Sequence, residues 1–402
     1  MTSRERIRKL LDRKPVDRIP NGLGGCETAG LHMLAYNKLK AILRIESSET
    51  RLDTFMCNAV MELEVLEAMQ GDIVLLASPL MCSSNFWGSD IKSEWKKQML
   101  WDQSFMVPKT ETFVTEANGT IWWGNSKCPP DGIFFDHVPD EVNDTQSYAI
   151  PIPSPDDFNP LNDISDNKLR ALEEQARWLF ENTNYSINCG ETIQDLQICP
   201  MPMTEWWMLM IEQPQIVHEY LSKACEAGLS QLKLLDQAIG KYTDILSIAH
   251  DWGDMRGVTM GPDLWREIYK PHYKRLFTQW HEITNMKINL HSCGSIVDIL
   301  PDFIECELDI LNPVQISARE MDPENLITKF GDKLIFYGGC FDVIQNPPGT
   351  PDEVVFESVR KNIMTLSKNG GYIFAGVHNI PGDTPQSHLK AMLDAYNDCN
   401  AL

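Results

Sequence analysis

A histidine, a cysteine and a glycine close one short apolar run of the sequence, KINLHSCG. Side chains two positions apart on a strand face the same side, so His291 and Cys293 are predicted to project together. A second cysteine, Cys340, ends the run KLIFYGGC. One imidazole and two thiolates suit Zn²⁺ and leave a fourth position open, as in catalytic zinc sites. Buried cysteines and hydrogen-bonded histidines are also ordinary packing residues, so the residues alone leave both interpretations open.

Other polar side chains follow further apolar runs. They are candidates for proton transfer, for substrate contact or for support of the metal ligands. Capping of the next turn or helix explains the two acids equally well, and a structural hydrogen bond explains the last histidine equally well. The residues are Glu191 after YSINCG, His250 and Asp251 after DILSIA, and His378 after GYIFAGV.

The elements that must position these residues follow from the hydrophobic pattern. Eight apolar runs rich in Ile, Val and Leu recur, and segments with helical spacing lie between most of them. This alternation predicts an α/β fold, a (β/α)8 TIM barrel, with its chemistry at the C-terminal ends of the strands. The runs span residues 18–25, 71–78, 185–191, 244–251, 287–294, 308–315, 333–340 and 371–379, and helices are expected over 52–70, 214–240, 261–283 and 350–371, among others.

One stretch departs from this alternation. Residues 85–150 carry no helical period, contain a turn signal at Asn118-Gly119 and hold short alternating segments. They predict a small β meander inserted after the second strand, at the C-terminal mouth of a single barrel domain that spans residues 1–402. An aromatic lid there would suit an aromatic substrate, although these rings also suit packing of the insertion. The aromatics are Trp87, Trp95, Trp101, Trp122, Trp123, Phe134 and Phe135, with Trp206 and Trp207 beyond the third strand.

Composition narrows the class of protein. The 402 residues include 35 Lys and Arg against 57 Asp and Glu, a formal net charge of −22. Such a surface repels phosphate backbones and anionic membranes, so neither nucleic acid nor a membrane is expected as a partner. The eleven cysteines lack the density of a secreted disulfide scaffold, and no apolar stretch reaches the length of a membrane span, which together favour a cytoplasmic protein.

Several longer segments together resemble the uroporphyrinogen decarboxylase superfamily over nearly the whole chain. They are RERIRKLLDRKPVDRIP, GPDLWREIYKPHYKRLF, HSCGSI, DILNPVQ, MDPENLITKFGDKLIFYGGCFD, GTPDEVVFESVRKNI and GGYIFAGVHNIPGDTP. The resemblance implies a (β/α)8 barrel. The decarboxylases themselves carry an arginine-bearing motif after the first strand, whereas this chain reads NGLGGCETAGLH there, without Arg or Lys. A decarboxylase is therefore disfavoured.

The remaining branch is the corrinoid-dependent methyltransferases, whose zinc is held by His-x-Cys and a distant cysteine. His291, Cys293 and Cys340 match that motif. The implied activity is that of an O-demethylase component, which transfers a methyl group from a methoxylated aromatic compound to the Co(I) corrinoid of a partner protein in anaerobic one-carbon metabolism. The chain has no D-x-H-x-x-G corrinoid-ligand motif of its own, in keeping with a separate corrinoid-binding protein.

Two alternatives stay open at this point. A methylcorrinoid:thiol methyltransferase of the coenzyme M type would use the same zinc to activate a thiolate. A non-catalytic barrel that binds a tetrapyrrole would need no metal. The oligomeric state, with a homodimer among the options, and the roles of Glu191, His250, Asp251 and His378 are not fixed by the sequence.

Overall fold

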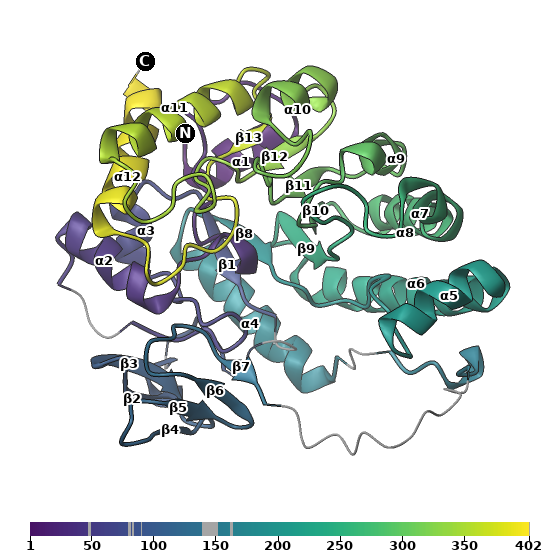
Figure 1. Cartoon of the computed structure of the whole chain (residues 1–402), viewed down its shortest axis with the longest axis horizontal. Helices are drawn as coiled ribbons and strands as arrows, with labels where there is room; N and C mark the ends of the chain where they lie inside the picture. The colour runs from purple at the N-terminus through teal and green to yellow at the C-terminus, as the bar shows by residue number, and fades with distance from the viewer. Residues whose placement is uncertain are drawn as a thin grey trace.

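A curled sheet of parallel strands forms the centre of the protein (Figure 1). The computed structural model describes residues 1–46, 50–78, 82, 84–89, 91–138, 152–160 and 164–401. Seven strands pair in the order β1-β8-β9-β10-β11-β12-β13. They are β1 (Ile73–Leu76), β8 (Ser186–Cys189), β9 (Ile245–Ala249), β10 (Lys287–His291), β11 (Ile310–Asn312), β12 (Ile335–Tyr337) and β13 (Tyr372–Ile373).

A short backbone bridge joins the two edges of this sheet. Asn21 forms a parallel bridge with Phe374, next to β13, and the Asn21 carbonyl accepts a hydrogen bond of 2.7 Å from the amide of Asp72, just before β1. The predicted barrel fold is confirmed, and seven of the eight predicted runs contain strands. The first run supplies only the bridge, because Pro20 has no amide hydrogen and the glycines that follow weaken a regular ladder.

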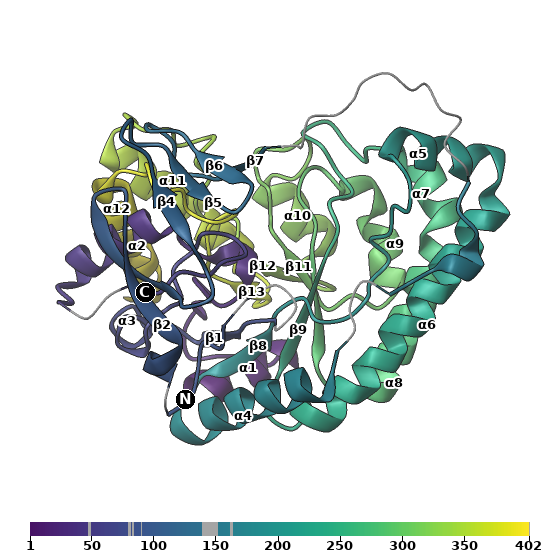
Figure 2. The same cartoon turned by 90° about the horizontal axis from the view of Figure 1, so that it is seen from below.

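Helices surround the sheet, as the second view shows (Figure 2). Among the described helices, none combines the length and the apolar character that a membrane crossing requires. The prediction of a helix over residues 52–70 is wrong for the first half of that range. Backbone bridges of Leu52 with Ala59 and of His32 with Asn58 hold that part extended. The helices are α1 (Ser3–Leu11), α2 (Met33–Leu43), α3 (Leu63–Ala68), α4 (Asp166–Asn182), α5 (Met203–Glu212), α6 (Pro214–Ile239), α7 (Pro262–Ile268), α8 (Lys270–Ile283), α9 (Leu300–Glu305), α10 (Pro323–Phe330), α11 (Asp352–Leu366) and α12 (Gln386–Ala401).

Helix α1 covers the N-terminal end of the barrel. Its buried side chains Ile7 and Leu10 belong to one apolar cluster with Ile73, Ile245 and Ile310, which lie near the starts of three strands. The helix begins with a capping box between Thr2 and Glu5, so its register is set by its own first turn. Because α1 closes this end, the opposite end, where the strands finish, is left to carry polar side chains.

The segment between β1 and β8 contains two small antiparallel sheets. Its aromatic side chains pack against one another: Trp123 lies 5.3 Å from Phe113 and 5.7 Å from Phe135 between ring centroids, and Trp101 lies 5.9 Å from Phe135. Both views place these sheets beside α2. Of the insertion expected over 85–150, residues 90 and 139–150 lie outside the described residues. The strands are β2 (Trp95–Leu100), β3 (Gln103–Pro108), β4 (Phe113–Thr115), β5 (Ile121–Trp123), β6 (Ser126–Cys128) and β7 (Asp136–His137).

Candidate metal centre

The polar residues singled out in the sequence stand where strands of the barrel end. His291 is the last residue of β10, and Cys293 follows it by two positions. Glu191 lies two residues beyond β8, and Asp251 two residues beyond β9. His378 lies in the segment that leads from β13 to α12. Parallel strands end on one side of a barrel, so these side chains, which follow β8, β9, β10 and β13, stand around one opening.

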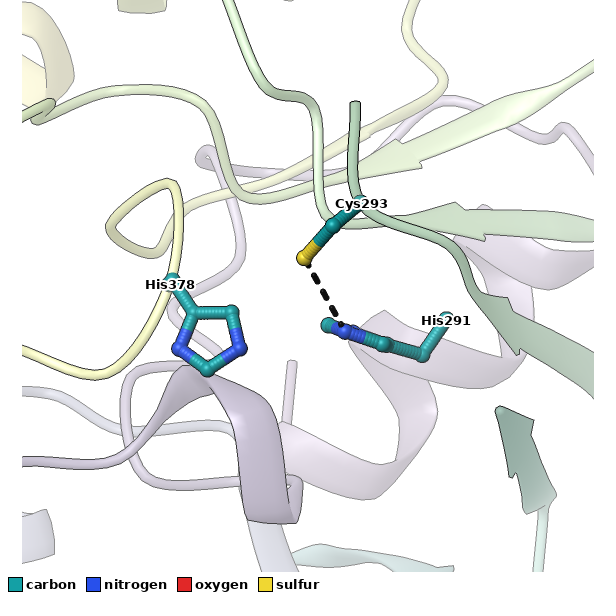
Figure 3. Close-up of side chains that lie close together, drawn as sticks. All are labelled: His291, Cys293 and His378. Atoms are coloured by element: carbon teal, nitrogen blue, oxygen red, sulfur yellow. Dashed lines mark hydrogen bonds between the residues drawn. The ribbon is translucent and has the colours of Figure 1, made fainter. Parts of the chain in front are cut away.

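Three of these side chains form a compact group, shown in Figure 3. His291, Cys293 and His378 each offer a ligand atom, and these atoms lie within 4.8 Å of one another. The Cys293 Sγ lies 3.4 Å from the His291 Nε2. Tetrahedral zinc with Zn–N and Zn–S bonds of ordinary length sets a nitrogen and a sulfur ligand about 3.5 Å apart. The spacing of the pair therefore fits zinc, and His378 would need only a small approach to complete a three-ligand set.

The loops after β9 and β10 fix this geometry through their backbones. The amide of His250 donates to the His291 carbonyl over 2.9 Å, and the amide of Cys293 donates to the Asp251 Oδ1 over 2.8 Å. Gly294 has a φ of +84°, and a Cβ at that position would lie 2.3 Å from the carbonyl carbon of Gly253. Glycine is required there because a side chain would collide with the neighbouring loop.

The Asn312 side chain, at the end of β11, orients the imidazole of His291. Its Nδ2 donates to the Tyr337 carbonyl over 3.2 Å, so its Oδ1 is the atom that accepts from the Thr28 hydroxyl over 2.7 Å and from the His291 Nδ1 over 2.8 Å. The proton of a neutral His291 therefore sits on Nδ1, which leaves a lone pair on Nε2, toward Cys293. A hydrogen-bond acceptor behind a histidine ligand is the usual support of a metal site.

Burial sets the protonation states of the group. It lowers the pKa of His291, and burial together with the nearby His291 lowers the pKa of His378 to about 4. Burial and the adjacent Asp251 raise the pKa of the Cys293 thiol to about 12. Both imidazoles are thus neutral near pH 7 and able to bind a metal, whereas the thiolate form of Cys293 requires a nearby cation.

The structure does not bring Cys340 to this group. Gly338 and Gly339 follow β12 with φ values of +101° and +84°, and these two left-handed residues end the alternation of side chains that the strand pattern assumes. The Cys340 side chain is fully buried, close to Tyr372 and to Cys399 of α12. His378 therefore takes the place expected for Cys340 as the third member of the group.

A cavity of about 610 Å³ opens beside the metal group. Asp251 connects the two, because it borders the cavity and its Oδ1 lies 3.7 Å from the His291 Nε2. Glu191 and His250 also border the cavity. Burial, followed by the charge of Asp251, raises the pKa of Glu191 to about 7, and burial lowers the pKa of His250 to about 3. The cavity thus offers a carboxyl group that exchanges a proton near neutral pH and a neutral imidazole.

The aromatic wall of this cavity differs from the wall expected. Trp206 and Trp207, picked out in the sequence, line it together with Trp252 and Tyr269, which the sequence analysis missed. The rings of His250 and Trp252 are stacked, with centroids 3.6 Å apart. The aromatics of the insertion are absent from the described lining of this cavity. Trp101, Trp123 and Phe135 pack in a separate apolar cluster, whereas Trp87 stacks on Trp178 of α4 and joins the main core. Trp252 could have been found from its place directly after Asp251 in the loop that follows β9.

Two further polar residues escaped the sequence analysis. Asn312 stands in the run LDILNPVQ, where a polar side chain at the end of an apolar strand was the available signal. Glu27 is 3 % exposed, and burial followed by the charge of Glu191 raises its pKa to about 8. Its Oε1 has no hydrogen-bond partner within the described part of the chain. Nothing in the local sequence distinguishes Glu27 from an exposed loop acid.

Comparison with known proteins finds a family that the C-terminal half of the chain resembles. Residues 201–399 match the sequence profile of the family described as Uroporphyrinogen decarboxylase (URO-D). This part of the chain contains β9 to β13 and with them His250, Asp251, His291, Cys293 and His378. The match supports the uroporphyrinogen decarboxylase superfamily that the sequence motifs resemble. No curated protein sequence matches the chain.

Solved structures resemble the protein over nearly its whole length. A "methyltransferase from Methanosarcina mazei" superposes with a TM-score of 0.57 at 15 % identity and covers 99 % of both chains. At this identity the likeness shows the barrel fold alone. A B12-independent methionine synthase from Shewanella sp. W3-18-1, in complex with selenomethionine, reaches a TM-score of 0.39 at 11 % identity, with 96 % of this chain and 95 % of that chain covered. A likeness of that extent supports no inference about this protein.

Proposed function

We propose that this protein is a zinc-dependent methyltransferase that demethylates a methoxylated aromatic compound and passes the methyl group to the Co(I) corrinoid of a partner protein. The observation that carries the proposal is the group His291, Cys293 and His378 beside a cavity with aromatic walls. The match to the URO-D family and the similarity in fold to the methyltransferase from Methanosarcina mazei are consistent with methyl transfer.

The donor set fits zinc and does not fit magnesium or calcium. Two neutral imidazoles and one thiolate are soft to intermediate ligands, which magnesium and calcium avoid. With three protein ligands, one position would remain for substrate. A zinc ion held by His291, Cys293 and His378 would supply Lewis acidity at an ether oxygen.

The surrounding residues have separate tasks in this proposal. Asn312 holds His291 in the tautomer that exposes Nε2. The Asp251 carboxylate fixes the backbone of Cys293 by accepting a hydrogen bond from the Cys293 amide. As the methyl carbon leaves the ether oxygen, the electron pair of the broken bond stays on that oxygen as a phenolate. Glu191, which borders the cavity and has a pKa raised to about 7 by burial and Asp251, is placed to give the phenolate its proton. His250 would orient the ring of the substrate.

The aromatic wall favours an aryl ether over a thiol as the partner in methyl transfer. Trp206, Trp207, Trp252 and Tyr269 offer faces and edges against which an aromatic ring can pack. A cavity of about 610 Å³ also lies within the usual range for a small-molecule site. A small aliphatic thiol would leave most of this surface unused.

The proposal is tested with reduced cob(I)alamin as a free acceptor. The zinc-loaded protein is mixed with methoxyphenols, methanol, methylamines or thiols, and the methylcobalamin spectrum is followed. We expect methyl transfer from a methoxyphenol, and its loss in Cys293→Ser. No transfer from any methoxyarene, together with demethylation of methylcobalamin by a thiol, would overturn the proposal.

A further inference from the structure

The cavity beside the metal group has an unusual balance of charge. Three of its lining residues are acids: Glu191, Asp195 and Asp251. Among the described residues that line it, none is Lys or Arg. Within the described part of the chain, none of the three acids forms an ion pair with a Lys or Arg, and Asp251 lies against the His291 imidazole and the Cys293 amide. The protein therefore supplies no basic side chain of its own to the carboxyl groups of this cavity.

The basic residues of the neighbouring loops are engaged elsewhere. Arg256, whose side chain is 89 % exposed, pairs with Asp254 over 3.0 Å. Arg266 pairs with Asp302 over 2.9 Å, and Arg319 pairs with Asp298 over 3.1 Å. These arginines lie beyond the lining of the cavity, on carboxylates of their own. A ligand that enters the cavity thus meets acids without their counter-charges.

The remaining lining residues also favour a cation. The faces of Trp206, Trp207, Trp252 and Tyr269 carry the negative side of an aromatic quadrupole, which attracts ammonium groups. His250 borders the same cavity, and its buried Nδ1 has no hydrogen-bond partner within the described residues. Because burial lowers the pKa of His250 to about 3, this imidazole is neutral near pH 7 and adds no positive charge to the cavity.

We infer that the cavity binds a methyl donor with an ammonium group and excludes donors with a carboxylate or sulfonate. That the ligand is a methyl donor rests on the proposed function, whereas the charge of the ligand is inferred from the cavity alone. The inference narrows the substrate class from methoxyarenes in general to amine-bearing methoxyarenes. Burial first, and the charge of a neighbouring acid after it, raises the pKa values of Glu191 and Asp195 to about 7, and a bound ammonium would favour the ionised form of both carboxyl groups.

The test uses three ligands that differ in charge and share one ring. They are 4-methoxybenzylamine, 4-methoxybenzyl alcohol and 4-methoxybenzoate, titrated into the full-length protein at pH 7 and followed by calorimetry and tryptophan fluorescence. We expect the amine to bind most tightly and the benzoate at least 10-fold more weakly than the amine. Equal or tighter binding of the benzoate would overturn the inference.

Variants separate the cavity from the overall charge of the protein. Glu191→Gln and Asp195→Asn are expected to reduce the advantage of the amine over the alcohol by 3-fold or more and to leave binding of the alcohol nearly unchanged. Asp394→Asn, on the remote helix α12, changes the net charge equally and should preserve the advantage. An equal loss in Asp394→Asn, or no loss in either cavity variant, would show that the net charge of −22 and not the cavity selects the ligand.

This test is independent of the proposed methyl transfer, because it measures binding without zinc loading or corrinoid. Demethylation of methoxyphenols together with tight binding of the benzoate would refute the charge selection and leave the proposed function standing. Preferential binding of the amine with no demethylation of any methoxyarene would refute the proposed function and leave the charge selection of the cavity standing.

Discussion

Asn312→Ala tests whether His291 is held ready for a metal. The Asn312 Oδ1 lies 2.8 Å from the His291 Nδ1, and this contact is the one that fixes the tautomer. Removing such a support of a metal ligand usually lowers metal affinity by about 10- to 100-fold, or about 1.4 to 2.7 kcal/mol. We expect a loss of zinc affinity within that range and not its abolition, because the ligands themselves remain.

The same substitution also costs stability. It leaves the Thr28 hydroxyl, the His291 Nδ1 and one acceptor at Tyr337 without their partner, and each such buried group costs about 1 to 3 kcal/mol. Asn188→Ala is the matched control. Asn188 is also fully buried within the barrel and bonds to Gly25 and Ser247, away from the metal group. It should lower stability without lowering zinc affinity.

The assay is a competitive titration of zinc against a chromogenic chelator, with thermal unfolding followed by circular dichroism on the same samples. Both variants are compared at a temperature at which they are folded. Wild-type zinc affinity in Asn312→Ala, or an equal loss in Asn188→Ala, would refute the argument that Asn312 prepares His291 for the metal.

Four other substitutions address the ligand set, a buried acid and the ion pairs at the N-terminal end of the barrel. His378→Ala should lower zinc affinity by at least 10-fold, whereas Cys340→Ser should preserve the zinc stoichiometry, as measured by mass spectrometry of the metal. Loss of zinc in Cys340→Ser, with unchanged zinc binding in His378→Ala, would identify Cys340 as a ligand in place of His378. Glu27 has a pKa of about 8 in the folded protein, above its ordinary value, so the folded state retains a proton that the unfolded chain releases, and stability falls as pH rises through this window. Glu27→Gln should therefore gain stability over the parent between pH 5 and pH 8, by up to about 1.4 kcal/mol per pH unit, in urea unfolding; a pH-independent difference would contradict the burial of a protonated acid. Asp72, whose side chain is fully buried, pairs with Arg6 at 2.6 Å and Arg18 at 2.7 Å. Asp72→Ala should cost about 3 to 5 kcal/mol, because it leaves Arg18 without an acidic partner and Arg6 with Asp17 alone; a loss below 1 kcal/mol would argue against the buried network.

The sequence predicted the barrel well because apolar runs and helical periods alternate along most of the chain. Residues His291 and Cys293 could be placed together, since strand alternation relates positions two apart. The pairing of His378 with them could not be predicted, because it depends on the path of a loop from a strand more than eighty residues away in the sequence. The position of Cys340 was beyond the strand rule as well, since two left-handed glycines precede it.

Local patterns were least informative about the cavity. Trp206 and Trp207 could be expected near the mouth from their place after the third strand. Tyr269 follows α7, and only the packing of that helix brings its ring to the cavity. Of the two roles expected for the aromatics of the insertion, the described structure supports packing, because Trp101, Trp123 and Phe135 join an apolar cluster and do not line the cavity.

X-ray absorption at the zinc edge, on protein loaded with one equivalent of zinc, tests the central claim most directly. The account predicts one sulfur and two imidazole nitrogens in the first shell, with the sulfur lost in Cys293→Ser and kept in Cys340→Ser. Two sulfur ligands would contradict the group formed by His291, Cys293 and His378. A failure to bind zinc at all would contradict the metal site and the methyl transfer proposed from it.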